Sequence, residues 1–560
     1  MALYKNNYPN VYQSVFTFNY KYKKESTEKA LEEEREKKQD ITKALEEERE
    51  KKQDITKALE EERGKKQDIA KALEKQKIIT KNTQNKLKQF EVISLSESIL
   101  KKKILFNSKQ ISILKQQYRN HHCHLNMTKK IAKQHIVNLG KAWAANTINT
   151  VIFRHHGIVT RENYQYTAFY LNEQTIKIIR RDLIDSKKLD IYELNGSYNL
   201  NDAHNSISLG VDQKGYIHIS YDHHGSKLHY RKSLKPFEIS QWTDELAMTN
   251  QNEENVTYPT FISPSETSPL MLMYRSGIWK KGSTFLKYYD EALEKWFDYP
   301  KPILSGSHQQ PWTSNAYWNH PVIDSYGCLH LSYCWRTDYL DDNQLINNMN
   351  INYAKSYDNG YSWLTSKNMN YKLPITQTIS EVVWAIPSQS NLINQTSMAI
   401  DSLGNPHIVY YSNDKNGIPQ LQHLWFNDEE WKRDFISERK EPFILSGGGT
   451  LELPISRPEI LIDRDDNVYV IYRSKETDNK LILLYLNAPA YKFTEGDTII
   501  LYDEPVGQSE PIIDRDRWEK ENILSLLVQY NLQPNGDMQT KEIFRDVKIV
   551  DIEFRDKGEE

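Results

Sequence analysis

The region from about Lys141 onward is built from short segments in which apolar and polar residues alternate. Alternation with a period of two is typical of β-strands that bury one face. Gly, Asn, Asp and Pro separate the segments, and these residues favour tight turns. The pattern predicts an all-β region over residues 141–560.

One type of segment recurs four times in this region. The copies are VDQKGYIHISY (211–221), IDSYGCLHLSY (323–333), IDSLGNPHIVY (400–410) and IDRDDNVYVIY (462–472). Each contains an Asp-x-x-Gly-like turn, in which glycine supplies a positive φ, followed by an alternating strand. Such repeats predict a β-propeller, in which each blade is a four-stranded antiparallel sheet. Seven blades of about 60 residues would fill the region, and six larger blades are the alternative.

A second motif also favours a propeller. Ser356, Asp358, Gly360 and Trp363 in SYDNGYSW form a Ser-x-Asp-x-Gly-x-x-Trp Asp-box. This box is a hairpin turn packed by its Trp. It occurs in sialidases and in many other propellers, so it indicates the fold and says little about the chemistry.

The N-terminal part of the chain has a different pattern. The sequence KALEEEREKKQDIT occupies residues 29–42, recurs at 43–56 and, with two substitutions, at 57–70. Glu33 and Lys37 form a favourable i,i+4 pair that each copy renews, which predicts a helix. Only half of a coiled-coil seam is apolar, so a weak coiled coil and a solitary charged helix both fit.

We therefore expect a seven-bladed, all-β propeller preceded by a long charged α-helical or coiled-coil segment. The expected boundaries are an N-terminal segment (1–25), a charged repeat helix or weak coiled coil (26–90), a helical linker (91–140) and the propeller (141–560). The charged helix is also the candidate surface for forming a homo-oligomer.

Composition narrows the classes of function. The net charge is −3 with 27% charged residues, which gives no electrostatic argument for binding nucleic acid. No run of eighteen apolar residues is present, so no membrane span is expected. The N-terminus lacks the apolar core of a signal peptide, which leaves the cytoplasm or export by another route as the expected location. The three cysteines do not form a disulfide framework.

Five of the sixteen histidines cluster in one short stretch that includes the first repeat. His218, His330 and His407 occupy the same position in three copies, and we interpret them as structural for that reason. His204 and His224 have no such counterparts, because the other copies carry different polar residues there.

These non-repeating positions are expected at strand ends opposite the Asp-x-x-Gly turns. In a propeller such ends converge on one mouth of the central channel, and fold symmetry does not explain a varied polar ring there. We therefore predict a site at this mouth. The candidate substrate-binding residues are Asn205, His223, Asn319, His320, Arg336, Gln395 and Arg457.

Several longer motifs are spread along residues 141–560. They are Asp202-Ala-His204-Asn205, Tyr221-Asp-His-His224-Gly, Tyr258-Pro259-Thr-Phe, Tyr274-Arg275-Ser-Gly277, the Asp-box followed by Pro374-Ile-Thr, and Asn394-Gln395 before Met398-Ala-Ile-Asp401-x-x-Gly404-x-Pro406-His407. With these motifs the region resembles the BNR-repeat proteins that include the ulvan-type polysaccharide lyases, which are seven-bladed propellers. The helical part has no place in that resemblance.

The resemblance implies β-elimination at a uronic acid of an acidic polysaccharide, with His204, His224, Tyr258 and Arg275 as catalytic residues. Removing the proton beside the sugar carboxylate requires neutralisation of that carboxylate, for which Arg is well suited. His and Tyr can serve as base and acid. The sequence does not assign these two roles, and His223 competes with His224. The chemistry requires no cofactor, and a structural metal ion is left open.

Three alternatives belong to other classes. One is a non-catalytic propeller that binds glycan or protein on an oligomerising helical stalk. Another is a sialidase-like glycoside hydrolase, which would need a pair of carboxylates, or a Tyr–Glu pair with three arginines. The last is a zinc site formed by His204, His223, His224 and His229, although adjacent residues of an extended strand point apart.

Overall fold

The computed structural model describes residues 129–185, 188–394, 397–494, 498–538 and 541–557. The predicted N-terminal segment, the charged repeat helix and most of the helical linker lie outside these residues. The expectation of a homo-oligomer formed through that helix therefore stays a prediction. Within the described residues, no helix is long and apolar enough to cross a membrane.

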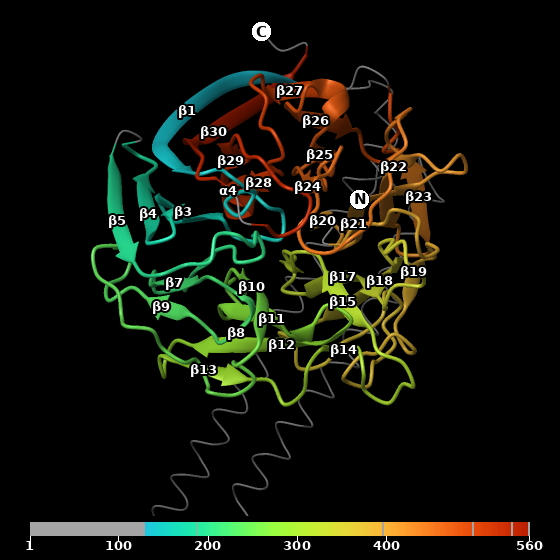
Figure 1. Ribbon diagram of the computed structural model, residues 1–560, viewed down its shortest axis with the longest axis horizontal. Helices are drawn as coiled ribbons and strands as arrows, with labels where there is room; N and C mark the ends of the chain where they lie inside the picture. Colours follow the sequence, from blue (N-terminus) through green and yellow to red (C-terminus); the bar gives the residue numbers. More distant parts are fainter. Residues whose placement is uncertain (1–128, 186–187, 395–396, 495–497, 539–540, 558–560) are drawn as a thin grey trace, which may run out of the picture. The chain divides into compact units, whose positions relative to one another are not determined.

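The described strands form seven antiparallel sheets that follow one another around a common centre (Figure 1). This is a seven-bladed β-propeller, as the repeats predict. The first three sheets are β2 (Ile158–Arg161), β3 (Tyr164–Asn172), β4 (Thr175–Asp182) and β5 (Leu189–Asn195); β6 (Ser208–Val211), β7 (Ile217–Ser220) and β9 (Tyr230–Lys232); and β8 (His224–Ser226), β10 (Val256–Ile262), β11 (Met271–Ile278), β12 (Lys281–Asp290), β13 (Lys295–Asp298) and β14 (Leu304–Ser305).

The other four sheets continue around the ring. They are β15 (Asn315–Trp318), β16 (Val322–Ile323), β17 (Leu329–Arg336), β18 (Asn348–Ser356) and β19 (Val382–Trp384); β20 (Ser397–Ile400), β21 (Pro406–Asn413), β22 (Pro419–Phe426) and β23 (Trp431–Phe435); β24 (Glu459–Ile462), β25 (Val468–Arg473), β26 (Leu481–Leu486) and β27 (Thr498–Tyr502); and β1 (Lys129–Trp143), β28 (Ile512–Ile513), β29 (Leu524–Gln529) and β30 (Phe544–Asp556). A 3-10 turn, η1 (Lys475–Thr477), and one short helix, α4 (Arg515–Glu521), interrupt the described strands.

The seventh blade joins the two ends of the described chain. β1 is its outermost strand and pairs antiparallel with β30 along most of its length. The propeller therefore includes residues 129–140, which are strand instead of the expected helical linker. Two register shifts, at Ile131/Lys133 and Asn138/Gly140, break the period-two pattern of this largely exposed edge strand, which explains why its sequence looked helical.

The repeated histidines serve the turns of the blades. His218 is fully buried, and its Nε2 lies 3.4 Å from Oδ2 of Asp212, the aspartate of the preceding turn. The other copies repeat this contact: His330 with Asp324 (3.0 Å), His407 with Asp401 (3.7 Å) and the Tyr469 hydroxyl with Asp463 (3.2 Å). Each turn is thus tied to its own strand, and the structural interpretation of these histidines is confirmed.

The Asp-box forms the turn that its motif predicts. The Ser356 hydroxyl donates to Asp358 Oδ1 at 2.7 Å, and the Gly360 N–H donates to Ser356 Oγ at 2.8 Å. The Trp363 ring is buried, and its Nε1–H donates to the Gly360 carbonyl at 3.0 Å. The box therefore stabilises the fourth blade.

Candidate active site

All four predicted catalytic residues line one pocket of about 140 Å³. His204 lies on the loop before β6, His224 on β8, Tyr258 on β10 and Arg275 on β11. The predicted substrate-binding residues Arg336 and Arg457 also line this pocket, as do Phe153, Trp279, Tyr317, Tyr339 and the 447–451 loop. Side chains far apart in sequence thus meet in one pocket.

The pairing of three neighbouring strands explains part of this convergence. Thr257 on β10 pairs with His224 on β8 and with Arg275 on β11. Directly opposed residues of an antiparallel sheet project to the same face, so the imidazole and the guanidinium share one face of the third blade.

Tyr258 reaches the pocket through an irregularity in β10. The register with β11 shifts between Thr257 and Thr260, and Tyr258 has a φ of +57°. A positive φ is uncommon for a bulky residue, and bulges often redirect a side chain beside an active site. The ring is buried next to Arg275, whose guanidinium carbon lies 5.0 Å from the ring centre.

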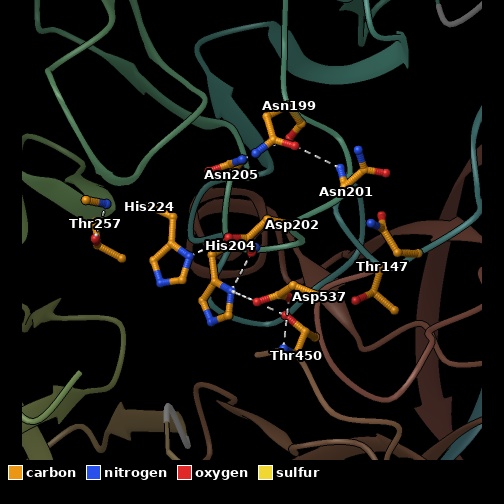
Figure 2. A network of polar contacts seen from close by, with 12 residues as sticks. Thr147, Asn199, Asn201, Asp202, His204, Asn205, His224, Thr257, Thr450 and Asp537 are labelled. Atoms are coloured by element: carbon orange, nitrogen blue, oxygen red, sulfur yellow. Dashed lines mark hydrogen bonds and ion pairs between the residues drawn. The ribbon is translucent and has the colours of Figure 1, made fainter. Parts of the chain in front are cut away.

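A carboxylate connects the two histidines (Figure 2). Asp202 Oδ1 lies 2.6 Å from His204 Nδ1, and Asp202 Oδ2 contacts His224 Nδ1. The two imidazole rings are stacked, with their centres 4.2 Å apart. Because both Nδ1 atoms face the carboxylate, they carry the ring protons in the neutral state and leave each Nε2 as an acceptor.

Burial and charge set the protonation of this group. Burial lowers the pKa of His204 below its usual value of 6.5, against the opposing effect of the hydrogen bond that His204 donates to Asp202. Burial alone would raise the pKa of Asp202, but the hydrogen bonds from His204 and His224 hold it below its usual value. His204 is therefore a neutral imidazole near neutral pH, with an aspartate anion behind it.

A second carboxylate completes the set around His204. Asp537 Oδ2 lies 3.9 Å from His204 Nδ1, and Asp537 Oδ1 accepts a hydrogen bond from the Thr450 N–H at 3.1 Å. Burial, with the nearby Asp202 charge, raises the pKa of Asp537. The ligand atoms of Asp202, His204, His224 and Asp537 all lie within 4.8 Å of one another, so these four residues are also able to hold a metal ion. The earlier zinc set is not assembled, because His223 and His229 face other partners.

The arginines of the pocket differ in their partners. Arg457 forms an ion pair with Glu510, whose Oε1 lies 2.8 Å from Arg457 Nε. Arg336 donates to Asn348 and Asn394, both at 2.6 Å. Arg275 is almost fully buried, and its Nε has no hydrogen-bond partner among the described residues. The cationic charge of Arg275 is therefore available to an anionic ligand.

Four of the predicted substrate-binding residues do not line this pocket. Asn205 donates to the Asn199 carbonyl at 2.9 Å, and Asn319 donates to Ser332 Oγ at 2.6 Å, so both support loops. His320 lies in a separate cavity near the propeller centre. From this part of the fourth blade it is Tyr317 that lines the active-site pocket.

His223 is the fourth. It is fully buried, with its Nε2 3.0 Å from Ser220 Oγ and its Nδ1 3.2 Å from Ser226 Oγ. His224, and not His223, therefore belongs to the pocket. Gln395 lies outside the described residues.

Sequence reasoning gave no role to the glycine run 447–449 or to Asp202. Gly449 has a φ of +73°, and a Cβ there would come within 2.6 Å of Asp537 Oδ2, so only glycine fits beside this carboxylate. Three consecutive glycines before Thr450 were a visible signal of close backbone approach. Asp202 was visible within a motif, but its contact with His224 depends on the fold.

Comparison with known proteins agrees with the fold. Residues 164–439 match the model of the BNR repeat-containing family. An ulvan lyase from Nonlabens ulvanivorans is 23% identical to this chain over 287 residues, covering 45% of this chain and 57% of that protein. An ulvan lyase from Alteromonas sp. (strain LOR) is 22% identical over 346 residues, covering 53% and 64%. This chain thus spans about three fifths of the length of these two relatives.

Solved structures with the same architecture are also lyases by name. Polysaccharide lyase Uly1 superposes with a TM-score of 0.55 at 15% identity, covering 75% of this chain and 98% of that one. A PL25 ulvan lyase bound to -[GlcA(1-4)Rha3S]- gives a TM-score of 0.51 at 14% identity, covering 73% and 95%. At these identities the likeness establishes that this chain shares their propeller fold.

Proposed function

We propose that this propeller is a polysaccharide lyase that cleaves a uronic-acid-containing polysaccharide by β-elimination in the pocket described above. The observation that carries the proposal is the meeting of His204, His224, Tyr258 and Arg275 in one pocket. The chain's similarity to proteins named as ulvan lyases supports the same reaction class.

Arg275 neutralises the sugar carboxylate. Its guanidinium is buried and cationic, and its Nε–H lacks an acceptor among the described residues. Both features are expected of a group that binds an anionic ligand. A bidentate contact with both carboxylate oxygens stabilises the charge that develops when the neighbouring carbon loses its proton. Arg457 is less suited to this role because Glu510 already compensates its charge.

His204 is the base and Tyr258 the acid. The neutral His204 Nε2 takes the proton from the carbon beside the carboxylate, and that carbon forms a double bond to its neighbour. The bond from the neighbouring carbon to the glycosidic oxygen breaks, and the Tyr258 hydroxyl protonates the departing oxygen. His224, with 34% of its side chain exposed against 11% for His204, is positioned to contact the sugar from the solvent side.

Asp202 is a positioning residue for this reaction. It accepts from Nδ1 of both imidazoles and from the backbone N–H of His204 at 2.9 Å. The carboxylate thereby fixes the ring orientations and the tautomers, and it stabilises the imidazolium that forms when His204 accepts a proton.

Two aromatic rings, tilted by 38° to each other, border the pocket and suit a sugar. Trp279 and Tyr339 are half-buried, with ring centres 5.0 Å apart, and both line the pocket. Their faces offer apolar contact for the C–H groups of a neighbouring sugar unit. The pocket therefore fits a polysaccharide that extends beyond the sugar unit that reacts.

A lyase fits the charges of the pocket better than a hydrolase. Three arginines do line it, as the sialidase alternative requires, but Arg457 is held by Glu510. The carboxylates nearest the histidines are those of Asp202 and Asp537. Both lie on the Nδ1 side of the His204 ring, so they do not form a pair that flanks a sugar.

The test is to incubate the full chain with a panel of uronate-containing polysaccharides, ulvan included, and to follow the ultraviolet absorbance of the unsaturated uronate product. We expect absorbance to rise with the native chain and to vanish in His204→Ala and Arg275→Ala. Arg336→Ala is the matched control and should retain turnover with a higher KM. A flat trace on every polysaccharide, from protein with an intact circular dichroism spectrum, would indicate a binding propeller instead.

A further inference from the structure

Three histidines converge on a small cavity near the centre of the propeller, apart from the active-site pocket. His155 and His156 precede β2, and His320 lies between β15 and β16. Each is at least nine-tenths buried. The cavity has a volume of about 20 Å³ and is also lined by Arg154, Glu459 and Arg515. A volume of this size holds about one water molecule or one ion.

The rings face one another with unused nitrogens. The His320 ring centre lies 4.9 Å from that of His155 and 4.6 Å from that of His156. His156 Nε2 and His320 Nδ1 are buried without a hydrogen-bond partner among the described residues. Buried polar atoms normally have a partner, so two orphaned imidazole nitrogens in one cavity indicate a missing ligand.

The backbone is bent to bring two adjacent histidines together. His156 has a φ of +55°, a left-handed conformation that is uncommon for a residue with a side chain. In an extended strand the two neighbouring rings would point to opposite sides. Here both contact the His320 ring. Such local strain persists only where the surroundings impose it, and it concentrates at functional positions.

The three rings are in the state that ligates metals. Burial lowers the pKa of His155 and His320 well below the usual 6.5, and it lowers the pKa of His156 to about 4. Neutral imidazole is the form that coordinates a metal ion, so no proton has to be displaced near neutral pH.

Two carboxylates moderate the positive charge around the cavity. Arg515 opposes positive charge at all three rings, but it is ion-paired with Glu459. Asp516 Oδ2 lies 4.0 Å from His156 Nδ1 and supplies negative charge beside that ring. The Arg154 guanidinium donates to backbone carbonyls. Glu459 and Asp516 therefore offset part of the positive charge that a bound cation meets.

We propose that His155, His156 and His320 bind one divalent transition-metal ion, with zinc as the best fit. Zinc–nitrogen bonds of about 2.0–2.1 Å at tetrahedral angles place the centres of two shared imidazole rings about 5 Å apart. Both observed separations from His320 are close to that value. The ion itself fills the cavity, so a fourth ligand would have to come from the lining, which includes Glu459.

Ion binding requires a small rearrangement of the rings. The three histidines do not form a group whose ligand atoms all lie within 4.8 Å of one another, so the nitrogens have to turn toward a common point. Rotation about χ2 of histidine is soft, and it achieves this turn without moving the backbone. The bound ion then joins the segment before β2 to the fourth blade.

The test uses the full chain purified without chelator. Metal content is measured by plasma mass spectrometry, and the protein is then stripped with EDTA and titrated separately with Zn²⁺ and with Co²⁺. We expect one zinc per chain and, with cobalt, the intense visible absorption of a tetrahedral nitrogen site. His320→Asn and His156→Asn should each abolish both signals, and zinc should raise the melting temperature of the native chain but not of the variants.

The matched control is His224→Asn, because the Asp202, His204, His224 and Asp537 group is a second place where an ion can gather ligands. This variant should retain the ion. Loss of the ion in His224→Asn with retention in His320→Asn would place the metal in the active-site pocket and overturn the proposal. Absence of both zinc uptake and a tetrahedral cobalt spectrum in the native chain would overturn it as well, even if the His320 variant fails to fold.

Discussion

At the scale of single residues, Asp202 holds two imidazole rings on one carboxylate, stacked 4.2 Å apart. Burial lowers the pKa of His204, the Asp202 carboxylate opposes that shift, and the neighbouring His224 ring adds to it. The protonation of His204 therefore depends on both of its neighbours.

The first prediction concerns pH. A general base acts when unprotonated, so activity is present above its pKa and is lost as the pH falls through it. Since burial lowers the pKa of His204, we expect the acidic limb of kcat/KM to lie below pH 6.5. The measurement is a profile of kcat/KM from about pH 4 to pH 8. A limb above pH 7 would argue against a buried His204 as the base.

The second prediction concerns Asp202→Asn. The amide cannot stabilise an imidazolium as the carboxylate does, so we expect kcat to fall by about 10–100-fold with little change in KM. Because the anion favours the protonated ring, its removal should also move the acidic limb to lower pH. Asp537→Asn is the control, since Asp537 lies 3.9 Å from His204 and does not hydrogen-bond its ring. Equal losses in the two variants would show that only net charge matters.

At the scale of elements, four of the blades are tied together at their first turn. In the fourth blade the Asp324 Oδ1 accepts from the Tyr326 and Cys328 N–H groups, both at 2.8 Å, while Oδ2 contacts His330. One side chain thus satisfies the turn and anchors the second strand of the blade.

The third prediction follows from this arrangement. Asp324→Ala leaves two backbone donors and a buried imidazole without their acceptor, so we expect the free energy of unfolding to fall by about 2–3 kcal/mol. Urea denaturation followed by tryptophan fluorescence measures the change. Asp465→Ala removes an exposed aspartate of the equivalent turn in the sixth blade and should change the stability by less than about 0.5 kcal/mol.

The features that sequence predicts well are those with local causes. The turn aspartates, the repeated histidines and the Asp-box all depend on residues within a few positions of one another. β1 was mistaken for helix because two bulges remove its alternation, and its partner β30 lies over 400 residues away. A strand defined by a distant partner leaves little trace in its own sequence.

The residues of the candidate site also differ in how well the sequence predicts their positions. His204, His224, Tyr258 and Arg275 were found through a resemblance in their motifs, and the structure brings them together. His320 was expected at the same mouth but lines another cavity, because the direction of a side chain just past a strand end depends on the local backbone, which the repeat pattern does not give.

At the scale of the whole molecule, closure of the ring depends on β1 and β30. Without β1, the edge of β30 would be exposed in the seventh blade. An unpaired strand edge is both a loss of hydrogen bonds and a template for aggregation.

The fourth prediction is a deletion. Removing residues 1–143 should lower the melting temperature markedly and promote aggregation, whereas a deletion that ends at residue 124 keeps β1 and should melt like the full chain. Differential scanning calorimetry with light scattering measures both effects. Equal melting of the two truncated chains would show that β1 is dispensable for closure.

The same pairing determines how the ring responds to mechanical force. Lys129 lies opposite Asp556, so both ends of the described propeller leave the β1–β30 ladder at the same end. A force that separates these two residues breaks the hydrogen bonds of the ladder one after another. It does not load all of them at the same time in shear. The ring should therefore open at modest tension by peeling β1 away, while the other six blades remain folded.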